Sequence, residues 1–402
     1  MSRLKFLGLG ALTAGTVWGT TLIAQAFQLP DPVPPIDALE SAPPGNSGEW
    51  PFVSIIVPAR NEERNLPRLL PTLLAQRYPH FEVVVVDDQS TDATPRILAE
   101  WAGRDPRLRV VTGHPLPRDS GWKGKPHAMH QGAQVARGAY LLFTDADTRH
   151  SPLSLSSSIA YSLAHDVDLL TIAPHFELVS IAEKLIMPVA YEGISVLYPA
   201  AGVNNPKSPV AIANGQYILI KRTVYHSAGG IERVKDCIAE DLEFGKAIKR
   251  DGYRLRVADG RHLMSVRMYN SLSEVWEGWG KNVVLSFRGN PIQGFLAMLG
   301  TVNISLTPAL LVRWAWLAWR TARESGKKAD QLSALWITLL AAWNTAMPLA
   351  FRARMDRLLG ISPLWTLTQP IGGALLGLIM LTSLYRLLTG KGVTWKGRVY
   401  NN

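Results

Sequence analysis

The sequence contains a single cysteine, Cys237, among 402 residues. One thiol cannot form a disulfide within the chain, and it cannot build a site in which several thiolates hold a metal ion. The small disulfide-stabilised folds and the thiolate-rich zinc modules are therefore excluded. A reducing compartment is permitted.

Charged residues are absent from four long stretches of the chain. Each is long enough for the roughly 20 residues with which a helix crosses the hydrocarbon core of a membrane. Hydrophobic residues make up 47% of the sequence and the mean hydropathy is slightly positive, so we expect part of the protein to lie in lipid. The four stretches are Leu7–Phe27, Pro291–Val312, Leu332–Phe351 and Ile361–Tyr385.

Glycine is absent from the segment PARNEERN, which follows the first apolar run of the chain's central region. A dinucleotide-binding fold would place a G-x-G-x-x-G turn at this point. A nucleotidyl transferase would normally place a glycine-rich, arginine-containing loop there. Both classes are therefore disfavoured.

The charge-free stretches and a proline-rich segment after the first of them predict the domain organisation. The region between the first and second stretches has mixed composition and the length of one catalytic domain. We expect a transmembrane helix over residues 1–28, a linker over 29–50, a catalytic domain over 51–288, a membrane region over 289–390 and a basic tail over 391–402.

The distribution of basic residues predicts the topology of the membrane region. If the stretch 291–312 lies along the interface or re-enters and the next two stretches span, the basic clusters at 313–328 and 386–398 fall inside, following the positive-inside tendency. We therefore expect a multi-pass cell-membrane protein with a cytoplasmic catalytic domain. A cleaved secretory signal ending near the AQA of residues 24–26 is an alternative for the N-terminus.

The formal net charge of +10 raises the question of a nucleic-acid partner. The basic residues are scattered along the chain and concentrate near the apolar stretches. This pattern favours anionic lipid head groups. We expect the membrane, and no nucleic acid, as a partner.

Apolar runs alternate with amphipathic helical patterns from Phe52 onward, which predicts an α/β fold with a mostly parallel sheet. Ligands of such sheets bind at the carboxyl ends of the strands. Acidic residues follow three of the predicted strands, so we expect them to meet in one crevice. They are Glu62 after the first, Asp87 and Asp88 after the second, and Asp145 and Asp147 after the fourth.

Asp145 and Asp147 stand one residue apart directly after the apolar run YLLFT. Two carboxylates this close repel each other unless a cation lies between them. Their hard oxygen atoms suit Mg²⁺ or Mn²⁺, which keeps further coordination positions for substrate phosphates. We therefore predict a divalent ion at this pair, where it would offset the charge of a diphosphate leaving group. The segment around Asp87 and Asp88 has a plainer alternative, because Ser90, Thr91 and Asp92 are good helix caps and acids suit a helix N-terminus.

Several segments, taken together, resemble the family-two inverting glycosyltransferases, which have a nucleotide-sugar-binding GT-A fold. The matching segments are VSIIVPARNEERNL, VVVVDDQSTDAT, GKPHAMHQGAQVARGAYLLFTDADT, PVAIANGQYILIKR and AEDLEFGKAIKRDG, in the family's order over most of residues 52–255.

The resemblance implies a role for each acid. Glu62 with Asp87 and Asp88 would hold the uridine, Lys125 would lie at the nucleotide pocket, and Asp145 and Asp147 would serve the diphosphate and its metal. Asp241 would be the general base that takes the proton of the acceptor hydroxyl. Without the family, Asp241 and its acidic neighbours read as ordinary first-turn residues of a helix.

The Q-x-x-R-W signature of the processive polysaccharide synthases is missing. The chain instead has RMYNSLSEVWEGWGKN at residues 267–282, which resembles membrane glucosyltransferases of hydroxylated carotenoids such as hydroxychlorobactene. The resemblance suggests Trp279 at the acceptor mouth or the membrane interface and Lys281 near the diphosphate, with helix packing as the alternative.

These features predict a membrane-bound, metal-dependent hexosyltransferase. We expect it to move one hexose, glucose from UDP-glucose, onto a hydroxyl group of an isoprenoid lipid such as a carotenoid. A polyprenyl phosphate or a hopanoid is the alternative acceptor. Nucleotidyl transfer and an inactive membrane scaffold are the alternatives from other classes.

Overall fold

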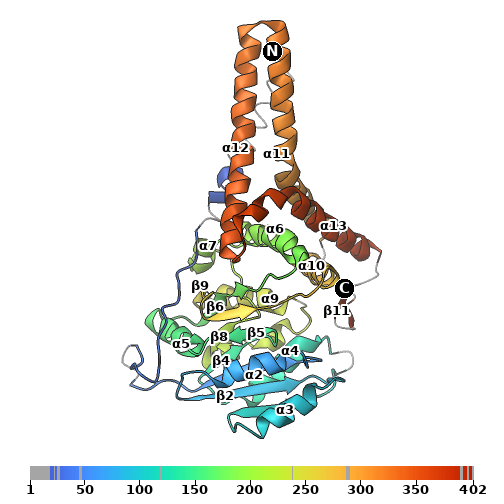
Figure 1. The fold of residues 1–402 in the computed structure, drawn as a ribbon. Coiled ribbons are helices and arrows are strands. Elements are labelled where there is room, and N and C mark those ends of the chain that lie inside the picture. Colours follow the sequence, from blue (N-terminus) through green and yellow to red (C-terminus); the bar gives the residue numbers. More distant parts are fainter. Residues whose placement is uncertain are drawn as a thin grey trace. The chain divides into compact units, whose positions relative to one another are not determined.

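The computed structural model describes residues 19–21, 23–24, 28–44, 48–117, 120–237, 239–286, 290–389, 393–395 and 398–400. Most of the first charge-free stretch and half of the expected basic tail lie outside these residues. The chain divides into two compact units (Figure 1). We call Leu29–Glu177 with Ala200–Met268 the sheet unit, and Met1–Gln28, Leu178–Pro199 and Tyr269–Asn402 the helical unit. This division differs from the expected catalytic domain, because 178–199 and 269–288 group with the helical unit.

The sheet unit is built on seven strands in the order β3-β2-β1-β4-β8-β6-β9. All run parallel except β8, which is antiparallel to both of its neighbours. The expected α/β fold with a mostly parallel sheet is confirmed. The strands are β1 (Val53–Ala59), β2 (Phe81–Asp87), β3 (Leu108–Thr112), β4 (Tyr140–Phe143), β6 (Leu169–Ala173), β8 (Ile218–Lys221) and β9 (Leu255–Asp259).

Helices cover this sheet, and a smaller sheet lies beside it. The central strands are buried along their length because helices remove both faces from water. The helices are α2 (Leu66–Leu74), α3 (Thr94–Ala102), α4 (Gly124–Val135), α5 (Ser154–Ala164), α7 (Ala200–Asn204), α8 (Arg222–Ser227), η1 (Ile231–Val234) and α9 (Glu240–Arg250). The small sheet has the order β5-β10-β7, from Thr148–His150, Met264–Val266 and His175–Phe176.

Helix α4 packs closely on β1 and β2 because it carries a glycine at the contact. A Cβ atom at Gly132 would lie 2.5 Å from Ile56 Cγ2 and 3.1 Å from Val86 Cγ2. A larger residue would force the helix away from the sheet. The close approach matters for the site because Lys125 lies in the first turn of α4.

The segment expected as a linker, residues 29–50, packs along the sheet unit. Val33 is fully buried and its N–H donates to Asp259 O at 3.0 Å. Asp37 forms an ion pair with Arg77, and Trp50 packs edge-on against Tyr78. Its apolar residues therefore contribute to the core of the sheet unit.

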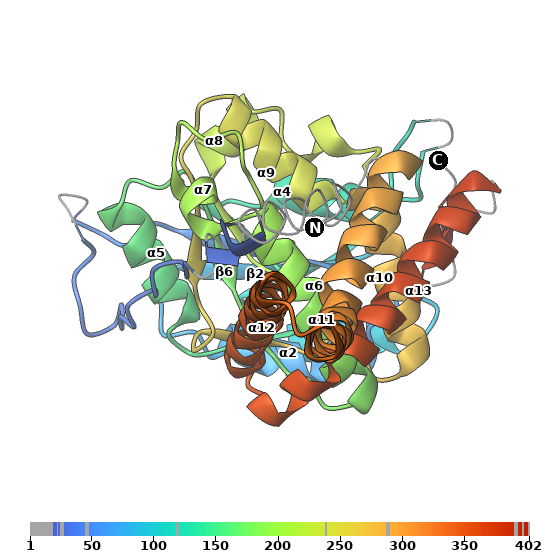
Figure 2. The same cartoon turned by 90° about the horizontal axis from the view of Figure 1, so that it is seen from above.

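The helical unit contains two helices, Lys328–Leu358 and Pro363–Leu388, that are long and apolar enough to cross a membrane. A third candidate, Pro291–Pro308 with Leu310–Ser325, bends by 42°. Within the unit, α11 and α12 lie side by side as a hairpin (Figures 1 and 2). Its elements are α6 (Ile181–Leu197), α10 (Leu272–Ser286), α11 (Pro291–Ser325), α12 (Lys328–Leu358), η2 (Pro363–Thr368), α13 (Gln369–Leu388), β11 (Val393–Trp395) and β12 (Arg398–Tyr400).

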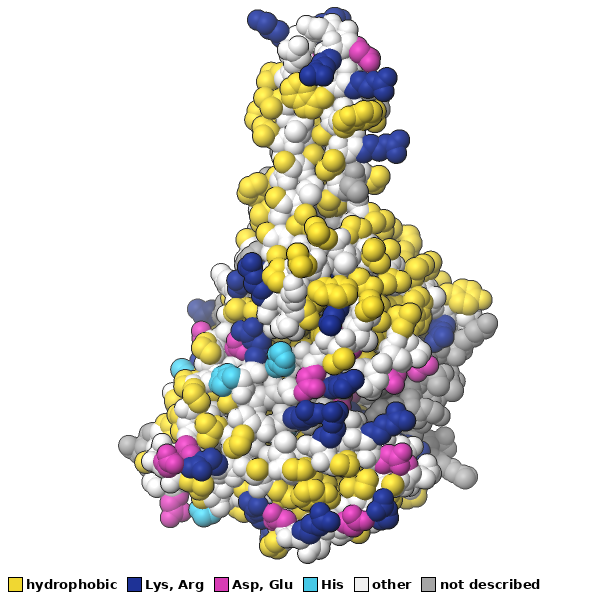
Figure 3. All heavy atoms as spheres, in the orientation of Figure 1, with side chains coloured by type: hydrophobic (Ala, Val, Ile, Leu, Met, Phe, Trp, Pro, Cys, Tyr) yellow, Lys and Arg dark blue, Asp and Glu magenta, His cyan; other side chains and the backbone are white. Residues whose placement is uncertain are grey.

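The α11–α12 hairpin exposes an unusual amount of apolar surface. Figure 3 shows hydrophobic side chains along much of its length, a pattern that marks surfaces made for lipid or for another protein. The exposed large residues of the hairpin include Leu296, Leu310, Trp314, Trp316, Leu332, Trp336 and Trp343.

A buried polar cluster joins α12, α13 and α6 within the helical unit. Arg352 is fully buried and donates to Asp356 Oδ1 at 2.7 Å, to Gln369 Oε1 at 2.8 Å and to Lys184 O at 3.0 Å. Gln369 in turn donates to Glu192 Oε2 at 2.8 Å. The guanidinium group is thus hydrogen-bonded to three different segments, as a buried charge requires.

Glu82 links the amino-terminal ends of β1, β2 and β4 in the sheet unit. Its side chain is 3% exposed and pairs with Arg137 at 2.8 Å. It also accepts hydrogen bonds from Ser54 Oγ at 2.7 Å and from the Arg137 N–H at 2.9 Å. Burial alone would raise the pKa of Glu82, but the hydrogen bonds from Arg137 and Ser54 outweigh it and lower the pKa.

Replacing Glu82 by Gln should destabilise the fold at neutral pH by about 1–3 kcal/mol, because Arg137 loses its charged partner. The pKa of Glu82 is lower in the folded than in the unfolded protein, so its contribution is present above the unfolded value of about 4.3 and disappears as the pH falls through the folded value. Thermal melting in detergent should therefore show a gap between variant and wild type at pH 7 that closes in acid. A gap that persists unchanged at about pH 3 would contradict this account.

Candidate active site

The loops after β1 and β2 are hydrogen-bonded to each other at the carboxyl edge of the sheet. Asn61, whose φ is 54°, donates its N–H to Ser90 Oγ at 2.9 Å and accepts from the Thr91 N–H at 2.8 Å. The Glu62 N–H donates to the buried hydroxyl of Thr94 at 2.8 Å. The two loops are therefore positioned as one piece.

The three acids predicted to hold the uridine all lie at this edge and are all buried. Glu62 accepts a hydrogen bond from Asn65 Nδ2 at 2.7 Å. Asp87 Oδ1 accepts from the Ser90 N–H at 3.1 Å, so Asp87 does act as a turn cap. Arg60 donates to Asp88 O at 2.7 Å and its guanidinium lies 3.9 Å from Asp88 Oδ2. The role of each acid toward a base stays a prediction.

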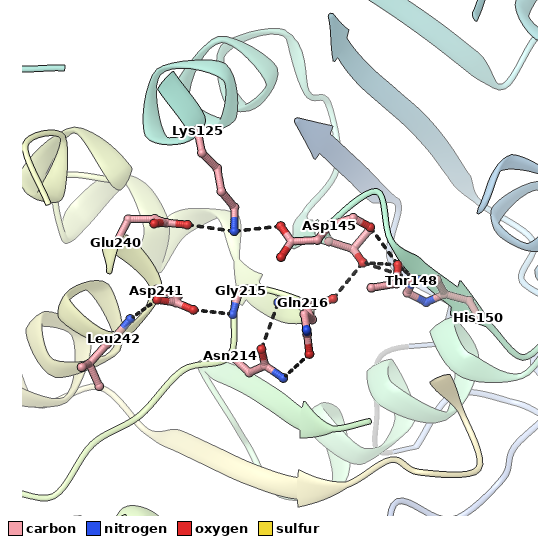
Figure 4. A network of polar contacts seen from close by, with 11 residues as sticks. Lys125, Asp145, Thr148, His150, Asn214, Gly215, Gln216, Glu240, Asp241 and Leu242 are labelled. Atoms are coloured by element: carbon pink, nitrogen blue, oxygen red, sulfur yellow. Dashed lines mark hydrogen bonds and ion pairs between the residues drawn. The ribbon is translucent and has the colours of Figure 1, made fainter. Parts of the chain in front are cut away.

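Lys125 lies at the centre of a cluster of carboxylates (Figure 4). Its Nζ is 2.8 Å from Asp145 Oδ1 and 2.9 Å from Glu240 Oε1. Asp145 follows β4, and Glu240 begins α9. One ammonium group from the first turn of α4 therefore joins the end of a strand to the start of another helix.

The carboxylates hold Lys125 in its charged form. Burial alone would lower its pKa, but the charges of Asp145, Glu240 and Asp241 raise the pKa of Lys125 well above the ordinary value of 10.5. The side chain keeps 35% of its surface exposed, so water screens part of this attraction. Lys125 is thus a permanent positive charge at neutral pH, next to Asp145.

Asp241 is held by two backbone N–H groups. Its Oδ2 accepts from Gly215 at 2.9 Å and its Oδ1 from Leu242 at 2.8 Å. A Cβ atom at Gly215 would lie 2.9 Å from Lys125 Nζ and 3.0 Å from Asp241 Oδ2. A side chain at position 215 would therefore push the ends of the Lys125 and Asp241 side chains aside.

Asp145 and Asp147 fit a divalent ion only together with oxygen atoms of a substrate. Within the described ranges, no group of three or more His, Cys, Asp or Glu side chains is arranged to hold a metal. One Asp145 oxygen already contacts Lys125. The remaining carboxylate oxygens are hard ligands, which suits Mg²⁺ or Mn²⁺ with incomplete protein coordination. Next to this pair, the Arg267 N–H donates to Asp147 O at 3.3 Å.

Trp279 and Lys281, the other predicted site residues, lie on α10 in the helical unit. Trp279 is 7% exposed; its Nε1 donates to Met187 Sδ at 3.0 Å, and its ring meets Tyr191 edge-on. This is the helix-packing arrangement that was the alternative for Trp279. Lys281 is partly exposed.

The loop Asn214–Gln216 is a part of the site that sequence reasoning missed. It lies beside Asp241 through Gly215 and is folded by hydrogen bonds between Asn214 and Gln216. The short segment NGQ, which separates the apolar runs VAIA and YILI, was the available sequence signal for a loop at this point. Nothing in their spacing connects them with Asp145 or Asp241.

Residues 54–226 match the family model "Glycosyl transferase family 2", and these residues include the ends of β1, β2 and β4. The chain carries a glycosyl transferase family 2 domain. The family 2 domain supplies Lys125, Asp145 and Gly215, while Glu240 and Asp241 follow it in the chain.

Two curated proteins and one solved structure describe what the chain is similar to. It is 28% identical over 243 residues to a 4,4'-diaponeurosporenoate glycosyltransferase of Staphylococcus haemolyticus, covering 58% of this chain and 61% of that protein. The protein of the same name from Staphylococcus aureus strain USA300 is 27% identical, with 58% and 60% covered. The match thus spans about 60% of the length of these relatives.

The solved structure is a mannosyltransferase of Pyrobaculum calidifontis in complex with GDP-Man and Mn²⁺. It covers 96% of this chain and 99% of its own, with a TM-score of 0.53 and 17% sequence identity. At this identity the likeness concerns the fold alone. It agrees with a GT-A-like α/β domain.

Replacing Lys125 by Met should change how the stability of the protein depends on pH. Without the ammonium group, Asp145, Glu240 and Asp241 face one another, so at least one carboxyl should gain a raised pKa in the folded state. A raised folded pKa adds stability as the pH falls. As the pH is lowered from about 8 to about 5, the melting temperature of the variant should therefore rise relative to that of the wild type.

Lys125→Arg is the matched control because it keeps the positive charge. Its melting curve should follow the wild type across the same pH range. If Lys125→Met and wild type respond to pH in parallel, the carboxylates do not depend on Lys125 for charge balance.

Proposed function

We propose that this protein is a membrane-bound inverting glycosyltransferase that moves one hexose from a nucleotide sugar, UDP-glucose, onto a hydroxyl group of an isoprenoid lipid such as a hydroxylated carotenoid. The observation that carries the proposal is the arrangement around Lys125 in a family 2 domain. Asp145 pairs with the ammonium group, and the Asp241 carboxylate lies near the same group beside Gly215. A displacement at a sugar carbon needs a base on the face of the attacking hydroxyl and stabilisation of the leaving diphosphate on the opposite face.

The residues divide the reaction between them. Asp241, fixed by two backbone N–H groups, accepts the proton of the acceptor hydroxyl. The hydroxyl oxygen attacks the anomeric carbon from the face opposite the diphosphate, and the bond from that carbon to the diphosphate breaks, so UDP leaves with the electron pair. Lys125 supplies positive charge near the departing phosphate oxygens. The configuration at the anomeric carbon is inverted.

Asp145 and Asp147 are the residues that would hold a divalent ion. Bound there, Mg²⁺ or Mn²⁺ would neutralise charge that develops on the diphosphate. Glu62 and the Asp87–Asp88 pair are proposed to hold the uridine at the edge formed by the loops after β1 and β2. Because Asp87 caps its own turn, Asp88 is the better candidate to accept a base N–H.

The acceptor is proposed to arrive from the membrane. The two apolar helices and the exposed apolar surface of the α11–α12 hairpin support membrane association. Trp279 and Lys281 keep their proposed place on the acceptor and diphosphate side. A carotenoid fits the names of the two curated relatives, and a polyprenyl phosphate or a hopanoid is the alternative acceptor.

A carboxylate is a second candidate for the accepting group. The ending of diaponeurosporenoate, the molecule in the relatives' names, denotes a carboxylate. At neutral pH a carboxylate has already lost its proton, because its pKa lies near 4. Transfer to it would need no general base, so the two acceptor groups differ in what they require of Asp241.

Asp241→Asn is therefore the decisive substitution. With a hydroxyl acceptor we expect kcat to fall by about 10²–10⁴-fold, the usual contribution of a positioned base, while UDP affinity stays near the wild-type value. With a carboxylate acceptor the fall should be much smaller. The measurement is UDP release from UDP-glucose with each acceptor in detergent, with Mn²⁺ and with EDTA.

The same assay separates the other classes. A nucleotidyl transferase would release pyrophosphate rather than UDP, and an inactive scaffold would release neither. Full turnover of a hydroxyl acceptor by Asp241→Asn would remove Asp241 as the base. The sugar transferred and the lipid that receives it would be identified by mass analysis of lipids from cells with and without the gene.

The topology of the hairpin provides a separate prediction. Because α11 packs along α12, we propose that both arms cross the membrane together, which places the tip near Lys328 outside when the catalytic domain is cytoplasmic. The distribution of basic residues predicts the tip inside. We expect a reporter fused at Lys328 to read external; an internal reading would favour the interfacial or re-entrant arrangement of residues 291–312.

A further inference from the structure

Behind the carboxylate cluster lies a buried group of neutral polar side chains (Figure 4). Thr144 follows β4, while Thr148 and His150 belong to β5. Thr144 and Thr148 are 1% exposed and His150 is 4% exposed. The proposed chemistry assigns no role to any of the three.

The two threonine hydroxyls each have their proton committed. Thr144 Oγ1 donates to Gln216 O at 2.8 Å, and Thr148 Oγ1 donates to Asp145 O at 2.8 Å. Both partners are carbonyl oxygens, which can only accept. Each hydroxyl therefore has lone pairs left and no proton to give to another group.

The positions of these protons bear on which ring nitrogen of His150 carries a hydrogen. The two hydroxyl oxygens lie 3.1 Å from each other, and His150 Nε2 lies 3.1 Å from both. When both hydroxyls donate to their carbonyl oxygens, Nε2 carries the ring proton and donates it to Thr144 and Thr148. His150 Nδ1 lies 3.3 Å from Ser154 Oγ and accepts from that hydroxyl. Burial lowers the pKa of His150 to about 3, in agreement with a neutral ring.

The network links the two sides of the proposed reaction centre. Through Thr148 it holds the backbone of Asp145, the residue on the diphosphate side. Through Thr144 it holds the backbone of Gln216, directly after Gly215, whose N–H binds Asp241. One imidazole N–H thus supports both the turn of Asp145 and the loop of the base.

We propose that His150 is a positioning residue that fixes the turn of Asp145 and the Asn214–Gln216 loop relative to each other through Thr148 and Thr144. The inference rests on the proposed function for its catalytic consequence. The carboxylates of Asp145 and Asp241 both lie near Lys125, and their separation decides whether donor and acceptor meet in line. A displacement of about 1 Å is enough to slow such a reaction about 100-fold.

The test uses four variants of the full-length protein in detergent. His150→Phe keeps a ring but removes both nitrogens, and His150→Gln keeps an N–H donor. Thr144→Val and Thr148→Val each remove one arm of the network with little change of volume. Ser162→Ala, which removes a buried hydroxyl that donates to Ser158 O within α5, is the control.

Amide hydrogen exchange followed by mass spectrometry reports the positioning without any substrate. In His150→Phe we expect exchange to speed up about tenfold or more in both 145–148 and 214–217, since each loses support worth about one buried hydrogen bond. In Thr148→Val the change should be confined to 145–148, and in Thr144→Val to 214–217. His150→Gln should exchange more slowly than His150→Phe in both segments, and Ser162→Ala should match wild type in both.

Kinetics give the second readout, with UDP-glucose as donor. His150→Phe should lower kcat about 10- to 100-fold at saturating donor, with partial recovery in His150→Gln and none of the loss in Ser162→Ala. If wild type releases UDP and His150→Phe does so at the wild-type rate, the proposal is overturned. If wild type turns over no nucleotide sugar, the proposed function fails, and the exchange pattern still decides the positioning role.

Two exchange results would overturn the proposal directly. One is unchanged exchange in either segment of His150→Phe. The other is faster exchange throughout the sheet unit, which marks a general loss of stability. If His150→Phe does not fold, Thr144→Val and Thr148→Val carry the test, because each must loosen its own segment and leave the other unchanged.

Discussion

The ion pairs of the Lys125 ammonium are the contacts on which the candidate site depends. Asp145 and Glu240 lie within 2.9 Å of its Nζ, and Asp241 adds a third negative charge nearby. Carboxylates gathered in a partly buried place repel one another strongly, so the cluster needs a cation in order to exist. The chain supplies one from the first turn of α4, which the glycine contact with β1 keeps close to the sheet.

A second constraint is the part that backbone groups play in fixing the acids. Asp241 is held by the N–H groups of Gly215 and Leu242, and Asp145 is held through its own carbonyl oxygen. This makes the site sensitive to the packing of buried residues that contact no ligand, because these residues decide where the backbone lies.

Several sequence patterns had two physical explanations, and the structure separates some of them. Of the paired acids at the end of β2, Asp87 caps its turn and the Asp88 carboxylate lies beside Arg60, while their role toward a base stays a prediction. Trp279 packs against Met187 in the helical unit, while its role toward an acceptor stays a prediction. The proline-rich segment 29–50 resembles a linker in composition, yet Val33 and Trp50 are buried against the sheet unit. Composition reports polarity and chain stiffness, and neither says which surface a segment will meet.

The α/β architecture, the acidic strand ends and the apolar helices of the C-terminal region were readable from residue order alone, because periodicity and strand-end position are local properties. The approach of Lys125 to Glu240, 115 positions away in the chain, and the contact of Gly215 with Asp241 were not. The same is true of His150, which reads as an ordinary polar residue after a D-x-D pair. Its role depends on which carbonyl groups the fold brings to Thr144 and Thr148, and long-range packing alone decides that.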